Sequence, residues 1–301
     1  GCGIAEGKTG MRKVHLPRTP EELWTVLDGE PEAAVYAGGT DLLVRIRAGQ
    51  LDPPALVCLE RMEIWRGVRE ESAALWLGAC TSLSELLLDE RVGRRLPLLA
   101  AAIAAIGSPQ IRNMGTLGGN LCAASPAGDS LPPLYVMKAE VELCSSRETR
   151  RMPVREFIAG PGRTRLRKGE ILAGVRVDVP QGFQMHRFEK VGQRKALACA
   201  IASLAGLLKF SDDGNLAEAR FAWGSVGPTV VVSAQVEEFL RGRKVTPATV
   251  EEAAALAERA VAPIDDVRGS AAYRREVAGN LLRKFLQGIA QKDRKQEPAS
   301  T

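Results

Sequence analysis

Histidine and clustered cysteine are scarce in this chain of 301 residues. Its two histidines are His15 and His186, and its six cysteines stand at positions 2, 58, 80, 122, 144 and 199, no two within ten residues of each other. Zinc and iron–sulfur sites usually take closely spaced cysteines as ligands. The sequence therefore predicts no metal site in this chain, and it offers no catalytic Ser-His-Asp or Cys-His arrangement.

Long apolar runs and a secretion signal are lacking as well. The longest apolar stretches, such as residues 98–106, are far too short to span a bilayer. No charged segment followed by an apolar segment stands near the N-terminus, as a secretory signal requires. We expect a cytoplasmic protein without a membrane span, whose cysteines are small buried apolar residues rather than disulfide partners.

Aromatic residues make up 5% of the chain and are not interleaved with its basic runs at residues 163–168 and 241–244. Proteins that bind single-stranded nucleic acid need aromatic stacking platforms. The net charge of +5 therefore does not indicate nucleic-acid binding. Charged runs are usually exposed, so we interpret these as solvated surface or, alternatively, as docking sites for acidic partner subunits or dinucleotide phosphates.

Local signals predict an α+β chain with many short strands. Thr19-Pro20-Glu21-Glu22 has the cap, proline and carboxylates of a helix start, and Ser82 with Glu85 is typical of a capping box. Helices are expected at residues 19–27, 41–48, 98–106, 231–241, 248–262 and 270–287, and after Ser82. Strands are expected at residues 33–37, 55–59, 73–79, 140–144, 170–179, 185–190, 198–210 and 216–223, with a hairpin turn at 212–215.

The order of these elements divides the chain near residues 180–182. We expect residues 1–10 to be a tail, an alternative start or an expression remnant, and residues 11–181 to form a domain of two α+β subdomains split near residues 50–55. Residues 182–290 are expected to form a second domain, a three-stranded sheet followed by helices. Residues 291–301 are expected to be a disordered tail.

Two glycine-rich loops are the most informative motifs. They are Ala37-Gly38-Gly39-Thr40-Asp41-Leu42 and Thr116-Leu117-Gly118-Gly119-Asn120. One adjacent glycine pair alone is typical of an ordinary tight turn. Two such loops, each with a hydroxyl and an amide or carboxylate, indicate a diphosphate held from two sides, because glycine amides approach a ligand without a Cβ in the way. Neither loop fits the G-x-G-x-x-G or P-loop fingerprint.

At these residues the sequence resembles the FAD-binding medium subunit of the molybdenum hydroxylases. That family includes xanthine dehydrogenase, aerobic carbon monoxide dehydrogenase, and the nicotinate and 4-hydroxybenzoyl-CoA enzymes. The likeness continues through residues 122–134, 157–162, 169–172 and 188–196, and covers roughly residues 11–291. It implies a two-lobed FAD-binding domain of the vanillyl-alcohol-oxidase (PCMH) type, followed by a smaller C-terminal domain.

The resemblance also implies where FAD is bound. The diphosphate is expected between the two loops, where the amides of four glycines and the hydroxyls of two threonines can donate hydrogen bonds. We expect the FAD to be held non-covalently, because neither histidine lies in a glycine loop. The residues expected to contact it are Val35, Tyr36, Ala37, Gly38, Gly39, Thr40, Asp41, Leu42, Ile106, Thr116, Leu117, Gly118, Gly119, Asn120, Cys122, Asp129, Leu172 and Lys190.

Two roles are possible for each of Asp129 and Lys190. Asp129 is expected to bind a ribose or ribityl hydroxyl, or else to cap the helix that starts at Ser130. Lys190 is expected to place a positive charge near the flavin ring and stabilise its reduced anion, or else to be a surface lysine on a strand. Arg194 and Lys195 are its expected companions, at the entrance for nicotinamide or a partner.

Ile106 and Cys122 complete the expected surroundings of the flavin. Ile106 replaces the aromatic residue of animal xanthine dehydrogenases, so simple apolar packing is expected there. Cys122 lies inside the second loop and can approach the flavin.

The family resemblance implies an electron-transfer subunit. A molybdopterin-bearing large subunit oxidises the substrate, and two [2Fe–2S] clusters on a small subunit pass the electrons to FAD on this chain. FAD then reduces NAD+, a quinone or another acceptor. A heterotrimer that dimerises is implied by the resemblance alone.

The substrate class has only a weak sequence signal. Thr40-Asp41 favours the xanthine/purine or N-heteroaromatic type over the carbon monoxide dehydrogenases, which more often carry His-Ser there. The sequence has no insert of the 4-hydroxybenzoyl-CoA type. The alternatives are a carbon monoxide dehydrogenase medium chain, a self-contained flavin reductase or oxidase of the same fold, and an adaptor that has lost FAD.

Overall fold

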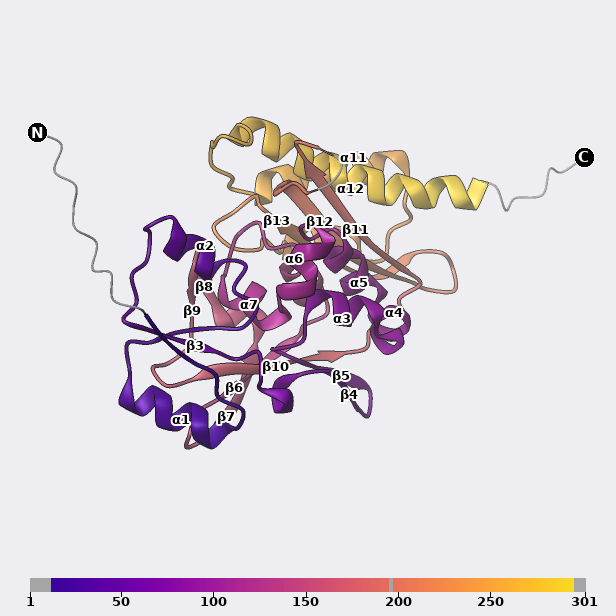
Figure 1. The fold of residues 1–301 in the computed structure, drawn as a ribbon. Coiled ribbons are helices and arrows are strands. Elements are labelled where there is room, and N and C mark those ends of the chain that lie inside the picture. The colour runs from indigo at the N-terminus through magenta and orange to yellow at the C-terminus, as the bar shows by residue number, and fades with distance from the viewer. Residues whose placement is uncertain (1–11, 195–196, 295–301) are drawn as a thin grey trace, which may run out of the picture.

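The computed structural model describes residues 12–194 and 197–294, so Lys195 and the expected tail at residues 1–10 lie outside the described residues. An N-terminal sheet of parallel strands has the order β1-β3-β2 and contains β1 (Lys13–His15), β2 (Ala34–Tyr36) and β3 (Ala55–Cys58) (Figure 1). Helices α1 (Pro20–Gly29) and α2 (Leu42–Arg47) accompany it. Thr19 caps α1 by accepting from the Glu22 amide, as expected.

The second sheet is antiparallel and assembles strands that are far apart in the sequence. Its order is β4 (Val68–Glu71), β5 (Ala74–Gly78), β10 (Ile171–Asp178), β6 (Glu140–Cys144) and β7 (Thr149–Pro153). The central strand β10 is almost wholly buried, whereas β6 alternates between buried and half-buried residues. Because β3 pairs with β1 and β2, the first sheet extends past the split expected near residues 50–55.

A layer of short helices connects the sheets. It contains α3 (Leu83–Leu88), α4 (Glu90–Arg95), α5 (Pro97–Ala104), α6 (Pro109–Met114), α7 (Leu117–Cys122), α8 (Leu131–Val136) and α9 (Val154–Phe157). A 3-10 turn at Glu63–Trp65 and the hairpin of β8 (Ile158–Gly160) and β9 (Arg163–Thr164) lie outside this layer. The Ser82–Glu85 capping box is confirmed. Helix α6 was not predicted; Ser108 caps it and Pro109 begins it, so α5 does not lead directly into the second glycine loop.

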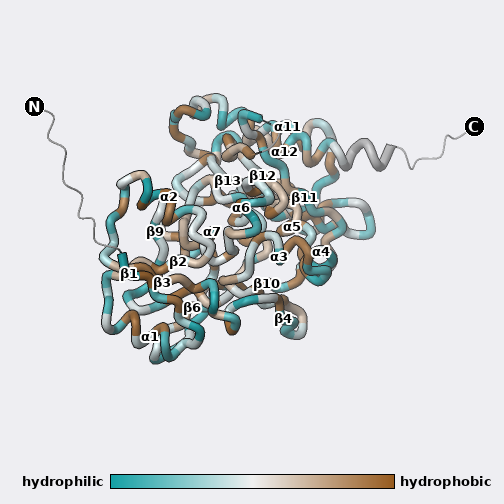
Figure 2. The backbone as a smooth tube through the Cα atoms, viewed as in Figure 1, coloured by the Kyte–Doolittle hydropathy of each residue, from teal (hydrophilic) through white to brown (hydrophobic). Residues whose placement is uncertain are grey.

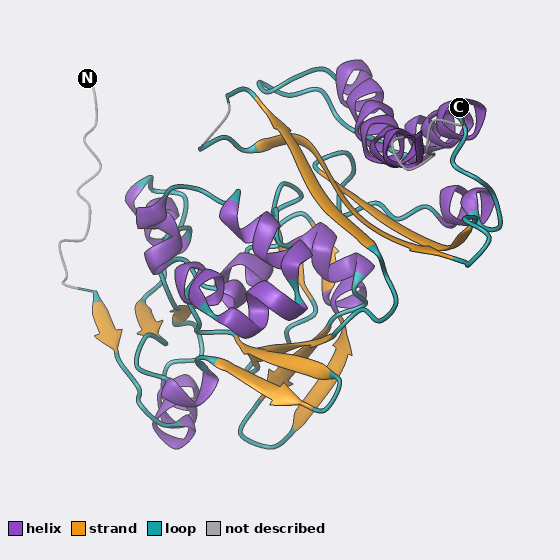
Figure 3. Ribbon diagram, turned by 90° about the vertical axis from the view of Figure 1, so that its right-hand side faces the viewer, coloured by secondary structure: helices purple, strands orange, loops and turns teal. Residues whose placement is uncertain are grey.

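The C-terminal part is a three-stranded antiparallel sheet with helices on one face. Strands β11 (Met185–Gly192), β12 (Ala200–Phe210) and β13 (Leu216–Gly224) are followed by α10 (Ala234–Leu240), α11 (Pro247–Ala260) and α12 (Ala271–Arg294). Figure 3 shows this sheet between its own helices and the central helical layer. Helix α12 runs to Arg294, so residues 291–294 are helical rather than part of the expected disordered tail.

The central sheet strand β12 is buried on both faces, and this joins the two halves of the chain. On one face Leu204 and Leu208 pack with α10–α12; on the other, Ala205 and Leu207 belong to the same apolar core as α5, α7 and α8. Figure 2 shows apolar residues concentrated along the inner strands, with mostly hydrophilic outer turns. The predicted α+β class and the C-terminal sheet with helices are confirmed.

Within the described residues, no helix is both long and apolar enough to cross a bilayer. The same part of the chain contains no cluster of three or more histidine, cysteine or acidic side chains suited to a metal ion.

Candidate functional site

The two glycine loops meet backbone to backbone. A Cβ added to Gly38 would lie 1.7 Å from the Met114 carbonyl oxygen, so only glycine permits this contact. The neighbouring Gly39 has a φ of +69°, in the left-handed region that glycine occupies without strain. The first loop is therefore pressed against the turn that introduces the second.

A cleft opens where the loops meet, and we call it the glycine-loop cleft. Residues from both loops and from the end of the central helices line it, which brings together most of the predicted site. The predicted residues along it are Val35, Tyr36, Ala37, Gly38, Gly39, Thr40, Asp41, Leu42, Ile106, Thr116, Gly119, Asn120 and Cys122.

The first loop presents a row of unpaired backbone donors. Among the described residues, the amides of Gly38, Gly39, Thr40 and Asp41 donate to no protein acceptor. Successive amides of this kind form a concavity that binds anions. A ligand rich in acceptor oxygens can accept hydrogen bonds from several of these amides at once.

The second loop uses its amides differently from the prediction. The Gly118 amide donates to the Ala79 carbonyl oxygen at 2.9 Å, and the Gly119 amide donates to Thr116 Oγ1 at 3.1 Å. These two glycine amides therefore already have acceptors within the chain, whereas the sequence prediction gave them phosphate oxygens. The Thr116 hydroxyl accepts from Gly119 and still has its own hydrogen to donate.

The two glycines of the second loop are required for different reasons. A Cβ on Gly118 would lie 2.6 Å from Ala79 Cβ, so Gly118 allows α7 to pack against the end of β5. A Cβ on Gly119 would meet only Thr116 Oγ1, at 3.1 Å, and Gly119 borders the cleft. Leu117 has 0% of its surface exposed and packs in the central core, so its side chain does not face the cleft.

An apolar compartment adjoins the glycine-loop cleft. Both are lined by Val35, Tyr36, Ala37, Gly119 and Cys122, and the compartment adds Leu59, Ala79, Cys80, Gly118, Leu166, Glu170, Ile171 and Leu172. This is where the structure places the predicted residue Leu172. Burial raises the pKa of the Cys122 thiol to about 12, so this cysteine stays protonated beside both spaces.

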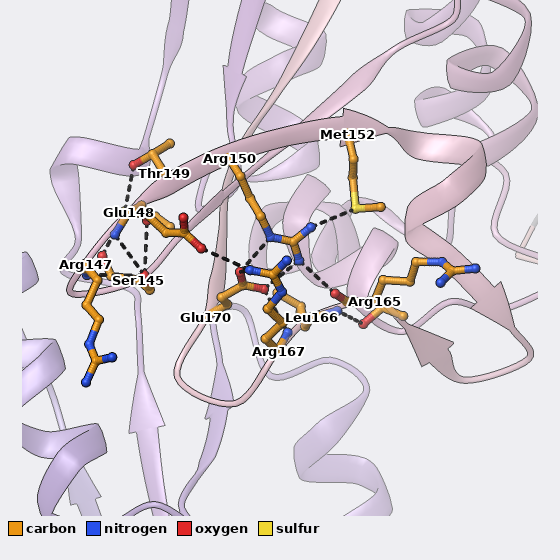
Figure 4. A network of polar contacts seen from close by, with 12 residues as sticks. Ser145, Arg147, Glu148, Thr149, Arg150, Met152, Arg165, Leu166, Arg167 and Glu170 are labelled. Atoms are coloured by element: carbon orange, nitrogen blue, oxygen red, sulfur yellow. Dashed lines mark hydrogen bonds and ion pairs between the residues drawn. The ribbon is translucent and has the colours of Figure 1, made fainter.

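An ion-pair network fixes one wall of the apolar compartment (Figure 4). Arg150 Nε and Nη2 bind Glu170 Oε1 and Oε2 at 2.7 and 2.8 Å, and the Arg167 amide donates to Glu170 at 2.8 Å. Hydrogen bonding from Arg150 lowers the pKa of the Glu170 carboxyl. The loop that carries Leu166 is thereby held in place.

The same network accounts for much of the basic run at residues 163–168. Arg165 donates to the Glu156 carbonyl oxygen, Arg167 pairs with Glu148, and Lys168 pairs with Glu32. These cations serve contacts within the chain.

Asp129 and Lys190 lie together beside the cleft rather than along it. Lys190 Nζ donates to Asp129 Oδ2 at 2.6 Å and to the Ala105 carbonyl oxygen at 2.9 Å. Burial raises the pKa of Asp129 to about 6, although Lys190 acts in the opposite direction. Asp129 Oδ1 is buried and has no partner among the described residues.

This pairing excludes one of the two alternatives given for each residue. Asp129 does not cap α8, whose N-cap is Ser130. Lys190 is not a surface lysine, because only 13% of its side chain is exposed. Lys190 lines a polar cavity together with Arg112 and Arg194. Ala105 and Gly107, the chain neighbours of the cleft residue Ile106, also line this cavity.

The residues present suit a flavin dinucleotide. Adjacent unpaired amides and two threonine hydroxyls provide donors for a diphosphate, and the apolar compartment can take an aromatic ring. Arg45 and Gly162 also line the cleft, although neither was among the predicted contacts. Arg45 stands four residues after Asp41 and pairs with it at 3.9 Å, a spacing that the sequence does display.

Comparisons with known proteins show the family to which the chain belongs. Residues 9–181 match the family described as the FAD binding domain in molybdopterin dehydrogenase, and residues 187–289 match the CO dehydrogenase flavoprotein C-terminal domain. The chain is 30% identical to the nicotinate dehydrogenase FAD-subunit of Eubacterium barkeri, over 91% of this chain and 94% of that one. It is also 30% identical to the carbon monoxide dehydrogenase medium chain of Afipia carboxidovorans, over 92% and 96%.

A solved structure shows the same fold. Quinoline 2-oxidoreductase from Pseudomonas putida 86 superposes with a TM-score of 0.89 at 26% identity, covering 95% of this chain and 99% of that one. With its paired glycine loops, unpaired amides and C-terminal sheet, the chain belongs to the family of FAD-binding subunits of the molybdopterin-dependent dehydrogenases.

Proposed function

We propose that the glycine-loop cleft holds FAD non-covalently and that the apolar compartment takes one of its ring systems. The observation that carries this proposal is the row of unpaired amides from Gly38 to Asp41. Diphosphate oxygens are the acceptors that such a row favours, and the hydroxyls of Thr40 and Thr116 add donors. When bound, FAD supplies a group that can accept electrons singly and release them as a hydride pair.

We further propose that this chain is the electron-exit subunit of a heterotrimer that dimerises. A [2Fe–2S] small subunit delivers electrons to it, and a molybdopterin large subunit oxidises the substrate. NAD+ is the proposed acceptor. The role of this chain's own residues is to bind and orient the cofactor, since the described residues offer no histidine along either compartment.

The proposed substrate of the complex is a purine or another N-heteroaromatic compound. Thr40-Asp41 supports this class, as does the similarity to the nicotinate dehydrogenase subunit. A carbon monoxide dehydrogenase medium chain is the second candidate, because the medium chain of Afipia carboxidovorans is also 30% identical to this chain.

The Asp129–Lys190 pair is proposed to set the charge beside the flavin ring. Lys190 is anchored by two oxygens, so its ammonium position is fixed before any ligand binds. An ammonium close to the ring favours the reduced, anionic form of a flavin, and its ion pair with the Asp129 carboxylate reduces this effect when Asp129 is ionised.

Gly119→Val should abolish or strongly weaken FAD binding in a folded protein, by on the order of tenfold or more, because its side chain enters the cleft. Gly118→Ala should instead lower the melting temperature, because its Cβ collides with Ala79. FAD titration and thermal unfolding separate the two effects. Gly93→Ala is the matched control, since nothing lies within 4 Å of the added Cβ; wild-type FAD affinity in folded Gly119→Val would contradict the placement.

The purified chain should show flavin absorption bands that bleach when NADH is added. Bands that NADH leaves unchanged but dithionite bleaches would contradict NAD+ as the acceptor and favour a quinone or another oxidant. Absence of flavin even after reconstitution with FAD would overturn the proposed function.

Asp129→Asn should change how stability depends on pH. Because its pKa is raised, Asp129 binds its proton more tightly in the folded state than in the unfolded state. Its contribution to the free energy of unfolding is therefore largest below about pH 4 and is lost as the pH rises through about 6. The free energy of unfolding of wild type minus that of Asp129→Asn should fall by on the order of 3 kcal/mol between pH 4 and 7. Denaturant titrations at several pH values measure this difference. A difference that does not change with pH would show that the pKa of Asp129 is not raised in the folded protein.

A further inference from the structure

Ser130 is a buried polar residue that the predicted cofactor contacts leave out. Its side chain is fully enclosed, with 0% of its surface exposed, and it directly precedes α8. Its hydroxyl donates to Asn120 Oδ1 at 2.6 Å. Asn120 belongs to the second glycine loop and lines the glycine-loop cleft, so a core residue is bonded directly to a cleft residue.

The sequence after Ser130 explains why this hydroxyl is available. A serine at a helix N-cap usually accepts a hydrogen bond from the amide of the second or third helical residue. In α8 those residues are Pro132 and Pro133, which have no amide hydrogen, and no side-chain capping bond is present. The Ser130 hydroxyl therefore bonds outside its own helix.

Helix α8 gives Ser130 a fixed position. Its residues Leu131, Pro132, Pro133, Leu134 and Val136 are all buried. A Cβ added to Gly224 of β13 would lie 3.0 Å from Pro132 Cγ, so the C-terminal sheet packs closely against the start of the helix. The position of the hydroxyl is thus determined by the core and not by the occupancy of the cleft.

The bond also determines which end of the Asn120 amide faces the cleft. An asparagine side chain has an acceptor oxygen and an NH2 group with two donor hydrogens. The oxygen accepts from Ser130, while the NH2 group has no hydrogen-bond partner among the described residues. Asn120 therefore presents a donor to a ligand, as the unpaired amides of the first loop do.

We propose that Ser130 is a positioning residue for cofactor binding: it holds the Asn120 amide so that its NH2 group donates to an acceptor atom of FAD. This inference rests on the proposed function, because it takes FAD as the occupant of the cleft. Ser130 itself does not touch the cofactor.

A double-mutant cycle with FAD titration tests the proposal. Ser130→Ala should weaken FAD binding roughly two- to tenfold, the range for one neutral hydrogen bond, and Asn120→Ala should weaken it at least as much. In the Asn120→Ala background, Ser130→Ala should cause no further loss, because its effect passes through the missing amide. A purely structural role for Ser130 would persist in that background.

Ser225→Ala is the matched control. Ser225 is a buried serine whose hydroxyl donates to the Ala200 carbonyl oxygen at 2.7 Å, and it lines neither the cleft nor the apolar compartment. Ser225→Ala should lower the melting temperature of the protein without changing its affinity for FAD. If Ser130→Ala does not fold, Ser130→Cys keeps nearly the same volume with a much weaker donor, and the same cycle applies.

Two results would overturn the inference: unchanged FAD affinity in a folded Ser130 variant, or losses that simply add in the double variant. Failure of the wild-type chain to bind FAD would instead contradict the proposed function, so the two failures are distinguishable.

Discussion

The contact between Gly38 and the Met114 carbonyl is the constraint on which the site depends. A single additional carbon at position 38 would overlap that oxygen, and the two loops would be forced apart. Because they touch, the unpaired amides of the first loop face the same space as Thr116 and Asn120 of the second. The cleft is therefore a product of backbone packing, and this packing requires glycine at position 38.

The chain segment Asp129-Ser130 links this cleft to the C-terminal sheet. Asp129 binds Lys190 of β11, and the next residue binds Asn120 of α7. Because β12 is buried on both faces, the C-terminal sheet shares its core with the helices that carry the cleft. Two consecutive residues thus hold both the Lys190 ammonium and the Asn120 side-chain amide in place.

Local features of the sequence predicted much of the fold. The caps at Thr19 and Ser82 and the alternation at residues 140–144 depend on neighbouring residues, and the structure confirms them. No helix was predicted between residues 106 and 116, where the structure has α6. The insertion of β10 between β5 and β6 depends on pairing over long sequence separations, which no local pattern records.

The sequence predicted which residues gather at the candidate site better than it predicted the hydrogen bonds that they make. Most of the residues proposed from the resemblance do line one cleft, but the Gly118 amide is used by Ala79 and Asp129 is used by Lys190. Both partners are set by tertiary packing. The sequence could indicate that these residues gather around a cofactor; it could not indicate which donors remain unpaired once the chain has folded.

The most direct test of this account compares the binding of FAD and FMN to the apo chain by calorimetry. FMN has the same flavin ring but lacks the diphosphate and the adenosine. If the unpaired amides of the first loop hold a diphosphate, FAD should bind at least about a hundredfold more tightly than FMN, since each hydrogen bond to a charged group contributes roughly 1.5–3 kcal/mol. Equal affinities for FAD and FMN would show that the first loop does not hold a diphosphate.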